Sequence, residues 1–496
     1  MHRRAFLQTA ATAAGLLPFV PRPTSAFRLP ASGPLAAIDA VRSDGSPLTL
    51  PGTAVRELSD SLRGPVLLPD STGYETARHV LNAAIDKRPA LIVQPTCSAD
   101  VRRAVSFAAA HQVLLAVKCG GHSFSGISTC DRGMMIDLAQ MRGVRIDPKA
   151  RRAWVEGGSL LGLVDHETAA YDLVTTLGTV SHTGVGGLTT GGGFGRLARK
   201  LGLAVDNVMS VDVVSADGQL RHADAQENPD LYWGVRGGGG NFGVVTTFEF
   251  QLHPRPAQFV AGNLVFPIAR ARDVLRFLAD YSPQAPDELQ LDFAMQQPPG
   301  NEPGVMVLQA CYCGTTPDRD LGVLRKLGTP MADSVQAVDY PAFQRSGDMS
   351  DPRARALYLK SGFTTGISDT LIAGILDGFD PHPSRTTMVF SQQAGGAIGR
   401  VPVTACAFPH RHAALSLMHA VAWKPGEDGG AHMASARRFW AAIEPLTSGF
   451  YVNEVADESR AVLNANYREN FPRMVAVKKQ YDPNNLFRLN ANVQPA

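Results

Sequence analysis

Three glycine-rich segments constrain the fold of this chain more than any other feature. They are AVKCGGHSFSG (residues 116–126), GTVSHTGVGGLTTGGGFG (178–195) and RGGGGNFG (236–243). Each lies beside an apolar or β-branched run that predicts a strand. Glycine lets another group approach the backbone closely, and the bare amides of such loops can bind anions. Three of these loops in one half of the chain indicate a long ligand that carries a diphosphate.

The third loop contains a literal dinucleotide fingerprint, Gly238-x-Gly240-x-x-Gly243. That motif needs a helix after the glycines, so that the helix N-terminus faces the phosphates. Here VVTTFEF follows, and its alternation predicts a strand, which argues against a nicotinamide dehydrogenase. The run from Gly121 looks like a nucleophile elbow, but Ser125 stands where G-x-S-x-G needs glycine, which argues against a serine hydrolase.

The order of predicted elements indicates an α+β protein. Short strands and helices alternate between residues 85 and 256; one helix begins at a capping Ser98 and ends at His111. Pro254 and Pro256 mark a boundary. Residues 257–450 mix helices with long alternating strands, and the tail 451–496 contains a further helix. The Pro-, Ser- and Gly-rich residues 27–60 are expected to form an extended lead-in.

The first 26 residues read as an export signal. Arg3-Arg4 precede a weakly apolar Ala/Leu run and a small-residue site that ends at Ala26. We expect twin-arginine export with cleavage near Ala26 and a periplasmic or secreted protein. The alternatives are an ordinary secretory signal or an uncleaved anchor.

Charge and cysteine content narrow the partners. The net charge is only +2, which does not favour nucleic acid or an anionic membrane surface as a partner. The spacing of the six cysteines matches no zinc pattern, and no metal site is predicted. Cys119 and Cys130 could bridge the first glycine loop, and the sequence leaves that open.

Taken in order, six motifs resemble those of the FAD-linked oxidases of the berberine bridge enzyme-like group, in the vanillyl-alcohol oxidase (PCMH-type FAD-binding) superfamily. They are GGHSFSG, GTVSHTGVGGLTTGGGFG, KLGLAVDNVMSVDVVSADG, DLYWGVRGGGGNFGVVT, FPHR and YDPNNLFRLNANVQP. The resemblance implies a two-part PCMH-type FAD-binding domain (27–84 as lead-in and start, then 85–256). It also implies a substrate domain (257–450) whose antiparallel sheet is covered by helices, and a C-terminal segment (451–496) that packs back on the FAD-binding domain.

The resemblance also implies a covalent cofactor. His122 matches the family histidine that bonds to the flavin 8α-methyl group, and Val180 stands where many members have a cysteine that makes a second bond. We therefore expect FAD with a single link, and non-covalent FAD is the alternative because Cys119 replaces the usual residue before the glycines. The cofactor-binding residues expected from the motifs are Lys118, Cys119, Gly120, Gly121, His122, Ser123, Gly126, Gly178, Thr179, Val180, Thr183, Gly184, Gly186, Gly187, Gly191, Gly192, Gly195, Asn207, Gly243, Val245, Asn490 and Asn492.

The implied activity is that of an exported oxidase. It would take a hydride from an alcohol, sugar or amine carbon of a small molecule to flavin N5, with oxygen as the expected acceptor. A flavin dehydrogenase with another acceptor and a non-catalytic flavin-binding protein are the alternatives. Such chemistry needs a base for the substrate O–H or N–H proton. The catalytic candidates are Tyr451, His419 and Glu454.

Three further residues have weaker expectations. His182 lies in the second glycine loop and either touches substrate or flavin or is a solvated loop residue. His410 and Arg411 of the FPHR motif are expected to order the substrate domain. The substrate itself, the choice between oxidase and dehydrogenase, and the oligomeric state do not follow from the sequence.

Overall fold

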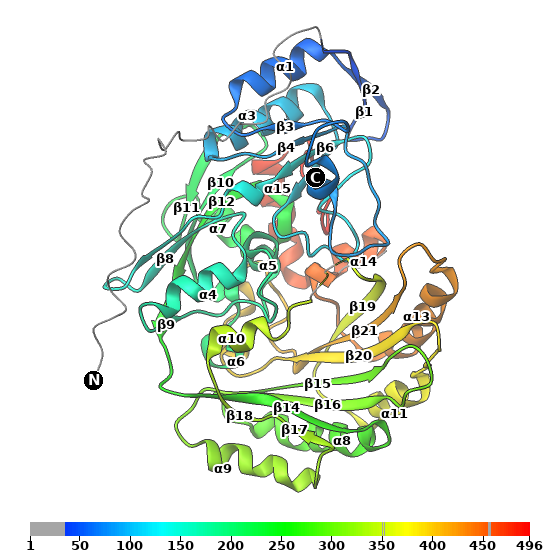
Figure 1. Ribbon diagram of the computed structural model, residues 1–496. Coiled ribbons are helices and arrows are strands. Elements are labelled where there is room, and N and C mark those ends of the chain that lie inside the picture. The colour runs from blue at the N-terminus through cyan, green and yellow to red at the C-terminus, as the bar shows by residue number, and fades with distance from the viewer. Residues whose placement is uncertain (1–34, 350, 352, 455–457) are drawn as a thin grey trace, which may run out of the picture.

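The computed structural model describes residues 35–349, 351, 353–454 and 458–496, and the predicted export signal lies outside them. Three sheets organise these residues, two in the N-terminal half and one in the middle region (Figure 1). Helices and sheets mix in each part, which confirms the predicted α+β class. No helix in these ranges is long and apolar enough to cross a bilayer.

The first sheet has four strands: β3 (Val66–Leu67) pairs antiparallel with β4 (Leu91–Val93), and the other two pairs are parallel. In spatial order the strands of this sheet are β3, β4, β6 (Met134–Asp137) and β5 (Leu115–Lys118). The predicted helix α3 (Ser98–His111) covers it, and Val101, Val105 and Ala108 are buried there. The N-cap is Cys97 rather than the predicted Ser98.

The described part of the segment expected to be an extended lead-in, from residue 35 onward, contains regular elements. Residues from 38 onward form the hairpin β1 (Ile38–Val41) and β2 (Pro47–Leu50), followed by the helix α1 (Gly52–Ser61). Val55 and Leu58 of α1 are buried in the same core as α3. Apolar residues three or four apart therefore outweighed the Pro/Ser/Gly composition on which the prediction rested.

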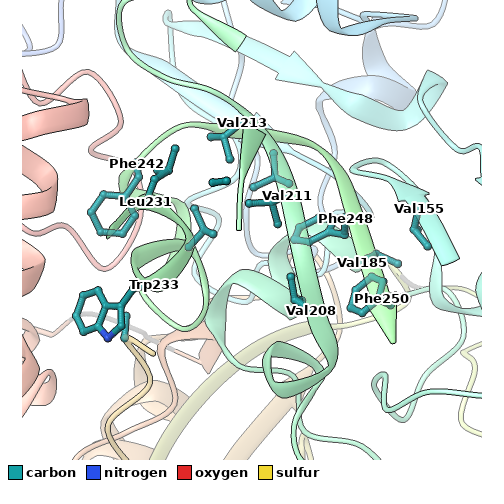
Figure 2. Packing of buried hydrophobic residues seen from close by; sticks show 14 of the residues in the cluster. Val155, Val185, Val208, Val211, Val213, Leu231, Trp233, Phe242, Phe248 and Phe250 are labelled. Atoms are coloured by element: carbon teal, nitrogen blue, oxygen red, sulfur yellow. The ribbon is translucent and has the colours of Figure 1, made fainter. Parts of the chain in front are cut away.

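The second sheet is antiparallel and has five strands. In spatial order they are β11 (Leu220–Ala223), β10 (Val208–Val214), β12 (Val244–Gln251), β8 (Arg152–Glu156) and β7 (Val144–Asp147). β12 follows the third glycine loop directly, which confirms that no helix begins there. Phe248 and Phe250 of β12 lie opposite Val211 and Val208 of β10. Leu231 and Trp233 come from the helix α7 (Pro229–Val235) (Figure 2).

The third sheet is antiparallel and crosses the middle region (Figure 1). Three helices cover one of its faces: α8 (Ala271–Tyr281), α11 (Asp369–Gly378) and α13 (Gly430–Ile443). Its other face meets the glycine loops, so this sheet is covered as predicted. Its eight strands are β17 (Ala332–Asp333), β14 (Phe259–Pro267), β16 (Val305–Tyr312), β15 (Leu289–Gln297), β20 (Thr386–Gln393), β21 (Leu415–Trp423), β19 (Ala356–Thr364) and β18 (Gln336–Val338), which pairs with β14.

The C-terminal tail returns to the N-terminal half through the helix α15 (Phe471–Tyr481). Lys478 is fully buried, and its ammonium donates to the carbonyls of Asn241 and Phe487 at 2.8 Å and to the Asp482 carboxylate at 2.7 Å. A buried charge needs such partners, since desolvation is costly. The third glycine loop is thereby fixed to the tail.

Further short α-helices and one small strand pair lie between these elements. The pair is β9 (Leu173–Val174) with β13 (His253–Pro254). The helices are α2 (Tyr74–Arg78), α4 (Leu161–Ala169), α5 (Val185–Gly191), α6 (Ala198–Leu201), α9 (Pro317–Gly322), α10 (Tyr340–Arg345), α12 (Ala397–Arg400) and α14 (Arg460–Asn466).

Candidate functional site

A cavity lies between the glycine loops and the sheet of the middle region. All three glycine loops, the strands β19, β20 and β21, and residues 451–454 and 487–491 contribute to its wall. Most of the predicted cofactor residues line it: Cys119, Gly120, Gly121, His122, Ser123, Gly178, Thr179, Val180, Thr183, Gly184, Gly186, Gly187, Gly243, Val245 and Asn490.

The glycines allow the loops to meet backbone against backbone. A Cβ on Gly120 would lie 2.4 Å from the amide nitrogen of Gly184, and one on Gly184 would lie 2.3 Å from that of Gly120. Real Cβ atoms do not approach backbone so closely, so neither position tolerates a side chain without a shift. At Gly187 and Gly239 a Cβ would meet open space within the cavity. The loops therefore form a narrow cradle with bare backbone facing inward.

Seven predicted cofactor residues do not border the cavity. Lys118 is buried beside Asp137 at 3.5 Å, and its ammonium donates to the Ala77 carbonyl. Asn207 is also structural: its amide donates to two backbone carbonyls, and its oxygen lies 2.6 Å from His253 Nε2. The others are Gly126, Gly191, Gly192, Gly195 and Asn492. The structure thus does not bring these seven to the cavity wall, since matching a motif does not show which of its residues face a ligand.

Gly191 and Gly192 instead allow two cavity residues to pack closely. A Cβ on Gly191 would lie 2.2 Å from the Asn453 Oδ1, and one on Gly192 would lie 3.3 Å from the Tyr451 ring. The Tyr451 hydroxyl accepts hydrogen bonds from the Gly193 amide and from the Asn453 amide group, both at 2.8 Å. Tyr451 is therefore fixed against the second glycine loop and keeps its own proton to donate.

His122 occupies the wall of the cavity beside a second histidine. His122 Nε2 lies 2.6 Å from His182 Nδ1, and Thr183 Oγ1 lies 3.3 Å from His122 Nδ1. Burial, together with the neighbouring His182, lowers the pKa of His122 to about 3. The ring is therefore neutral at neutral pH. His182 is half-buried and lies against His122. The expectation that it is a solvated loop residue is therefore corrected.

Glu454 is the buried carboxyl of this wall. Burial raises its pKa to about 8, and the hydroxyls of Ser361 and Ser416 offset part of that rise. Neither serine bonds it with good geometry: Glu454 Oε2 and both hydroxyl oxygens are without a hydrogen-bond partner among the described residues. The side chain is thus held close to its neutral form and has unused hydrogen-bonding capacity. Burial also raises the pKa of Tyr451, so that its hydroxyl stays protonated.

His419 lies on the other face of the sheet. Its ring packs against Phe439 of α13 with centroids 4.0 Å apart, and Nδ1 lies 3.0 Å from the Met388 carbonyl oxygen. The next residue back in the strand, Met418, faces the cavity. Successive side chains of a strand point to opposite faces, so the prediction of His419 as a base is corrected.

The middle-region sheet adds cavity residues that the sequence analysis missed. Leu359, Phe390 and Met418 form an apolar wall, and Gln392 adds an amide whose Oε1 is buried without a partner among the described residues. Alternation along each strand could have identified them only if the direction of one residue had been known.

The residues present fit a flavin dinucleotide. Open glycine positions at Gly187 and Gly239 leave backbone bare along the cavity. Asn490 donates to the carbonyls of Gly240 and Phe487 at 2.9 and 3.0 Å, while its own Oδ1 is buried without a partner among the described residues. An orphaned acceptor of this kind in a cavity calls for a ligand N–H or O–H group.

All six cysteines are free thiols in the described residues, so Cys119 and Cys130 form no bridge. Burial raises the pKa of the Cys119 thiol to about 11. The described residues hold no group of three or more His, Cys, Asp or Glu suited to a metal ion.

Comparison with known proteins agrees with this cavity. Residues 89–224 match the family described as FAD binding domain, and residues 450–494 match berberine and berberine like. An FAD-linked oxidoreductase of Dictyostelium discoideum is 30% identical over 449 residues, which cover 89% of this chain and 97% of that protein.

Two solved structures are also similar. 6-Hydroxy-D-nicotine oxidase of Arthrobacter nicotinovorans has a TM-score of 0.79 at 27% identity, with 88% of this chain and 99% of that chain covered. Xylooligosaccharide oxidase of Myceliophthora thermophila, solved with xylobiose, has a TM-score of 0.79 at 26% identity, with 89% and 99% covered.

Proposed function

Because this chain belongs to the berberine bridge enzyme-like family of FAD-linked oxidoreductases, we propose that it is an exported oxidase that removes a hydride from an alcohol, sugar or amine carbon of a small molecule. Bound FAD supplies the two-electron redox chemistry, and oxygen is the proposed acceptor of those electrons. The protein supplies the position of the substrate and the group that takes its proton.

His122 is the proposed attachment point for the flavin, through a single covalent link. Its place on the cavity wall and its neutral ring support this assignment, because a neutral imidazole has a nitrogen lone pair to offer. Val180 borders the same cavity, and a valine side chain carries no nucleophile for a second link.

The observation that carries the proposal is the buried carboxyl of Glu454 on the cavity wall. With a pKa near 8 it ionises within the range where enzymes work, and its ionised form accepts the substrate hydroxyl or amine proton as the hydride leaves. Tyr451 is the neighbouring hydroxyl donor and orients the substrate oxygen or nitrogen. Leu359, Phe390 and Met418 give the site an apolar wall, which favours a substrate with a largely apolar body.

Export by the twin-arginine route is part of the proposal. It rests on Arg3-Arg4, the Ala/Leu run and the small-residue site at Ala26. This route carries folded proteins, which suits an enzyme that acquires its cofactor first. Processing is tested by N-terminal sequencing of protein from the periplasm, where a start near residue 27 is expected.

The activity is tested by mixing the purified protein with a panel of small alcohols, sugars and amines without oxygen and following the flavin absorbance. Bleaching by one class, followed by recovery and hydrogen peroxide formation when oxygen is admitted, supports the oxidase. Recovery with an artificial acceptor but not with oxygen supports a dehydrogenase. If no substrate bleaches the bound flavin, the result supports a non-catalytic flavin-binding protein.

A further inference from the structure

The cavity has one acidic side chain and no cationic one among the residues that the structure describes. Its lining includes no lysine, arginine or aspartate, and Glu454 is its one carboxyl. Burial raises the pKa of the Cys119 thiol and of the Tyr451 hydroxyl, and the lowered pKa of His122 keeps that ring neutral. Any charge that the protein places on this wall at neutral or slightly alkaline pH is therefore the negative charge of Glu454.

Glu454 has no counter-ion in the described part of the chain. The groups beside its carboxyl are the neutral hydroxyls of Ser361 and Ser416, and no charged side chain of the described residues shifts its pKa. Arg196 does not border the cavity, because its guanidinium donates to two glutamine side chains and to the Thr179 carbonyl. Bound FAD brings no cation either, since its diphosphate is anionic. A buried carboxylate without a counter-ion is costly, so the ionised form of Glu454 needs a positive charge from a ligand.

Polar atoms without partners lie beside Glu454 on the cavity face of the sheet. Ser416 of β21 pairs in register with Gln392 of β20, so their side chains stand next to each other on one face. The Ser416 hydroxyl, Gln392 Oε1 and Glu454 Oε2 all lack a hydrogen-bond partner among the described residues. Carboxylate and amide oxygens can only accept hydrogen bonds, so this strip suits a ligand group with several N–H or O–H donors.

The wall next to this strip is apolar. Phe390 and Met418 form the neighbouring cross-strand pair of β20 and β21, and Leu359 of β19 extends the surface. A sugar would bury several hydroxyls against these side chains without partners, and each such group costs free energy. A carboxylate ligand would meet the like charge of Glu454 with no protein cation to offset it. The wall therefore suits an apolar body with one cationic end.

We propose that the substrate is a basic amine with an apolar body, which enters as an ammonium ion and becomes the counter-ion of Glu454. This inference rests on the proposed oxidase function and narrows its three substrate classes to one. An ammonium group presents two or three N–H donors, enough for the carboxylate and the unpartnered oxygens beside it. A charge-assisted hydrogen bond in a site shielded from water is stronger than the neutral one that an alcohol makes.

The ion pair also prepares the amine for oxidation. The Glu454 carboxylate takes one N–H proton, which leaves a lone pair on the amine nitrogen. The C–H bond of the neighbouring carbon then breaks, the lone pair forms a C=N bond, and a hydride passes to the bound flavin. The carbon is thereby oxidised and the flavin reduced. Oxygen recovers the hydride's electron pair and proton, and with the proton held by Glu454 it becomes hydrogen peroxide. Water hydrolyses the iminium product to a carbonyl compound and an amine.

The test measures binding rather than turnover. FAD-loaded protein is titrated without oxygen with benzylamine, benzyl alcohol and benzoate, and with cyclohexylmethylamine, cyclohexylmethanol and cyclohexanecarboxylate. Within each series the body is the same and the charge of the head group differs. Simple amines are protonated at pH 8, as lysine is. Affinity is read from the shift in flavin absorbance on mixing, before any bleaching.

Three variants accompany the wild type. E454Q removes the charge, and E454D keeps it on a shorter side chain. D165N is the matched control: Asp165 is also a buried carboxyl, and burial raises its pKa to about 7, but it does not border the cavity. Thermal melting checks that each variant is folded.

At pH 8 we expect the amines to bind wild type and D165N about ten-fold or more tighter than the matching alcohols, and the carboxylates to bind most weakly. E454Q should lose this preference, and E454D should keep part of it. The affinity of wild type for the amines should rise as pH increases toward about 8 and Glu454 ionises, while that for the alcohols changes little. Equal affinity for amine and alcohol in wild type, an undiminished preference in E454Q, or no binding of either amine would overturn the proposal.

Bleaching of the flavin separates this inference from the oxidase function. If alcohols or sugars bleach the flavin and no amine does, the oxidase proposal stands and the assignment of an amine substrate is overturned. If the amines bind with the expected preference but no substrate bleaches the flavin, the oxidase proposal fails, while recognition of an ammonium ion by Glu454 is supported.

Discussion

Arg411 and Asp206 form a two-pronged ion pair that joins the middle region to the N-terminal half. The guanidinium nitrogens Nη1 and Nη2 each lie 2.8 Å from a carboxylate oxygen, and the Arg411 side chain is fully buried. Asp206 follows the second glycine loop, where the amides of Ala204 and Val205 donate to the carbonyls of Gly193 and Gly192. The pair therefore holds the FPHR segment against the loop that borders the cavity.

Asp206→Asn should destabilise the protein strongly, because it leaves the buried Arg411 charge without its counter-ion. We expect a loss of about 3 kcal/mol or more in the free energy of unfolding, measured by urea denaturation. Arg473→Ala is the matched control: it removes an exposed pair with Asp230 at 2.7 Å and should cost less than about 1 kcal/mol. Equal effects of the two variants would contradict this role.

Gly184→Ala should strain the junction of the first two glycine loops. Its methyl carbon would lie 2.3 Å from the Gly120 nitrogen, so we expect a loss of about 1–3 kcal/mol in stability. Gly322→Ala has open space around it and serves as the control.

Gly187→Ala, which points into the cavity, should instead weaken FAD binding without lowering the stability of the FAD-free protein. This is measured by flavin titration in a His122→Ala background.

Turnover should depend on the ionisation of Glu454. Because its carboxylate is the proposed base, kcat should rise as pH increases toward about 8 and then level off. Glu454→Gln should lower kcat by about 100-fold or more and remove this rise, while the spectrum of the bound flavin stays unchanged. A Gln variant that keeps the wild-type pH profile would exclude Glu454 as the base.

The same carboxyl makes stability depend on pH. Its pKa is raised from 4.5 to about 8 on folding, so the folded state binds more protons than the unfolded state between these values. The contribution of Glu454 is therefore lost as pH rises from about 4.5 to 8. Glu454→Gln should be more stable than wild type at pH 8, and the difference should shrink toward pH 4.5. Melting temperatures across this range test the sign.

His419→Leu should affect stability and leave the chemistry alone. The ring packs against Phe439 in a tilted arrangement and uses Nδ1 for the Met388 carbonyl, away from the cavity. We expect a lower melting temperature with kcat and its pH dependence unchanged. A loss of kcat comparable to that of Glu454→Gln would restore His419 as a candidate base.

Local sequence chemistry predicted the elements near the glycine loops well. The β-branched run after Gly243 correctly indicated β12. This prediction worked because the period of side chains along a strand is set by neighbouring residues.

The faces of the middle-region sheet could not be predicted in the same way. In LSLMHAVAW, residues 415–423, every residue is buried, so no alternation of polar and apolar residues shows which face His419 takes. The Met349 contact of His182 was equally inaccessible, because the two residues are 167 positions apart and meet only through tertiary packing. The motifs thus identified the cavity, while the direction of single side chains required the fold.

The measurement that tests the central claim most directly is the mass of the denatured protein. Wild type and His122→Ala are purified with FAD, unfolded in acid, separated from free flavin, and examined by intact mass and flavin fluorescence. The account predicts one FAD on the wild-type polypeptide and none on His122→Ala. Release of all flavin from the wild type, or retention by His122→Ala, would contradict attachment through His122.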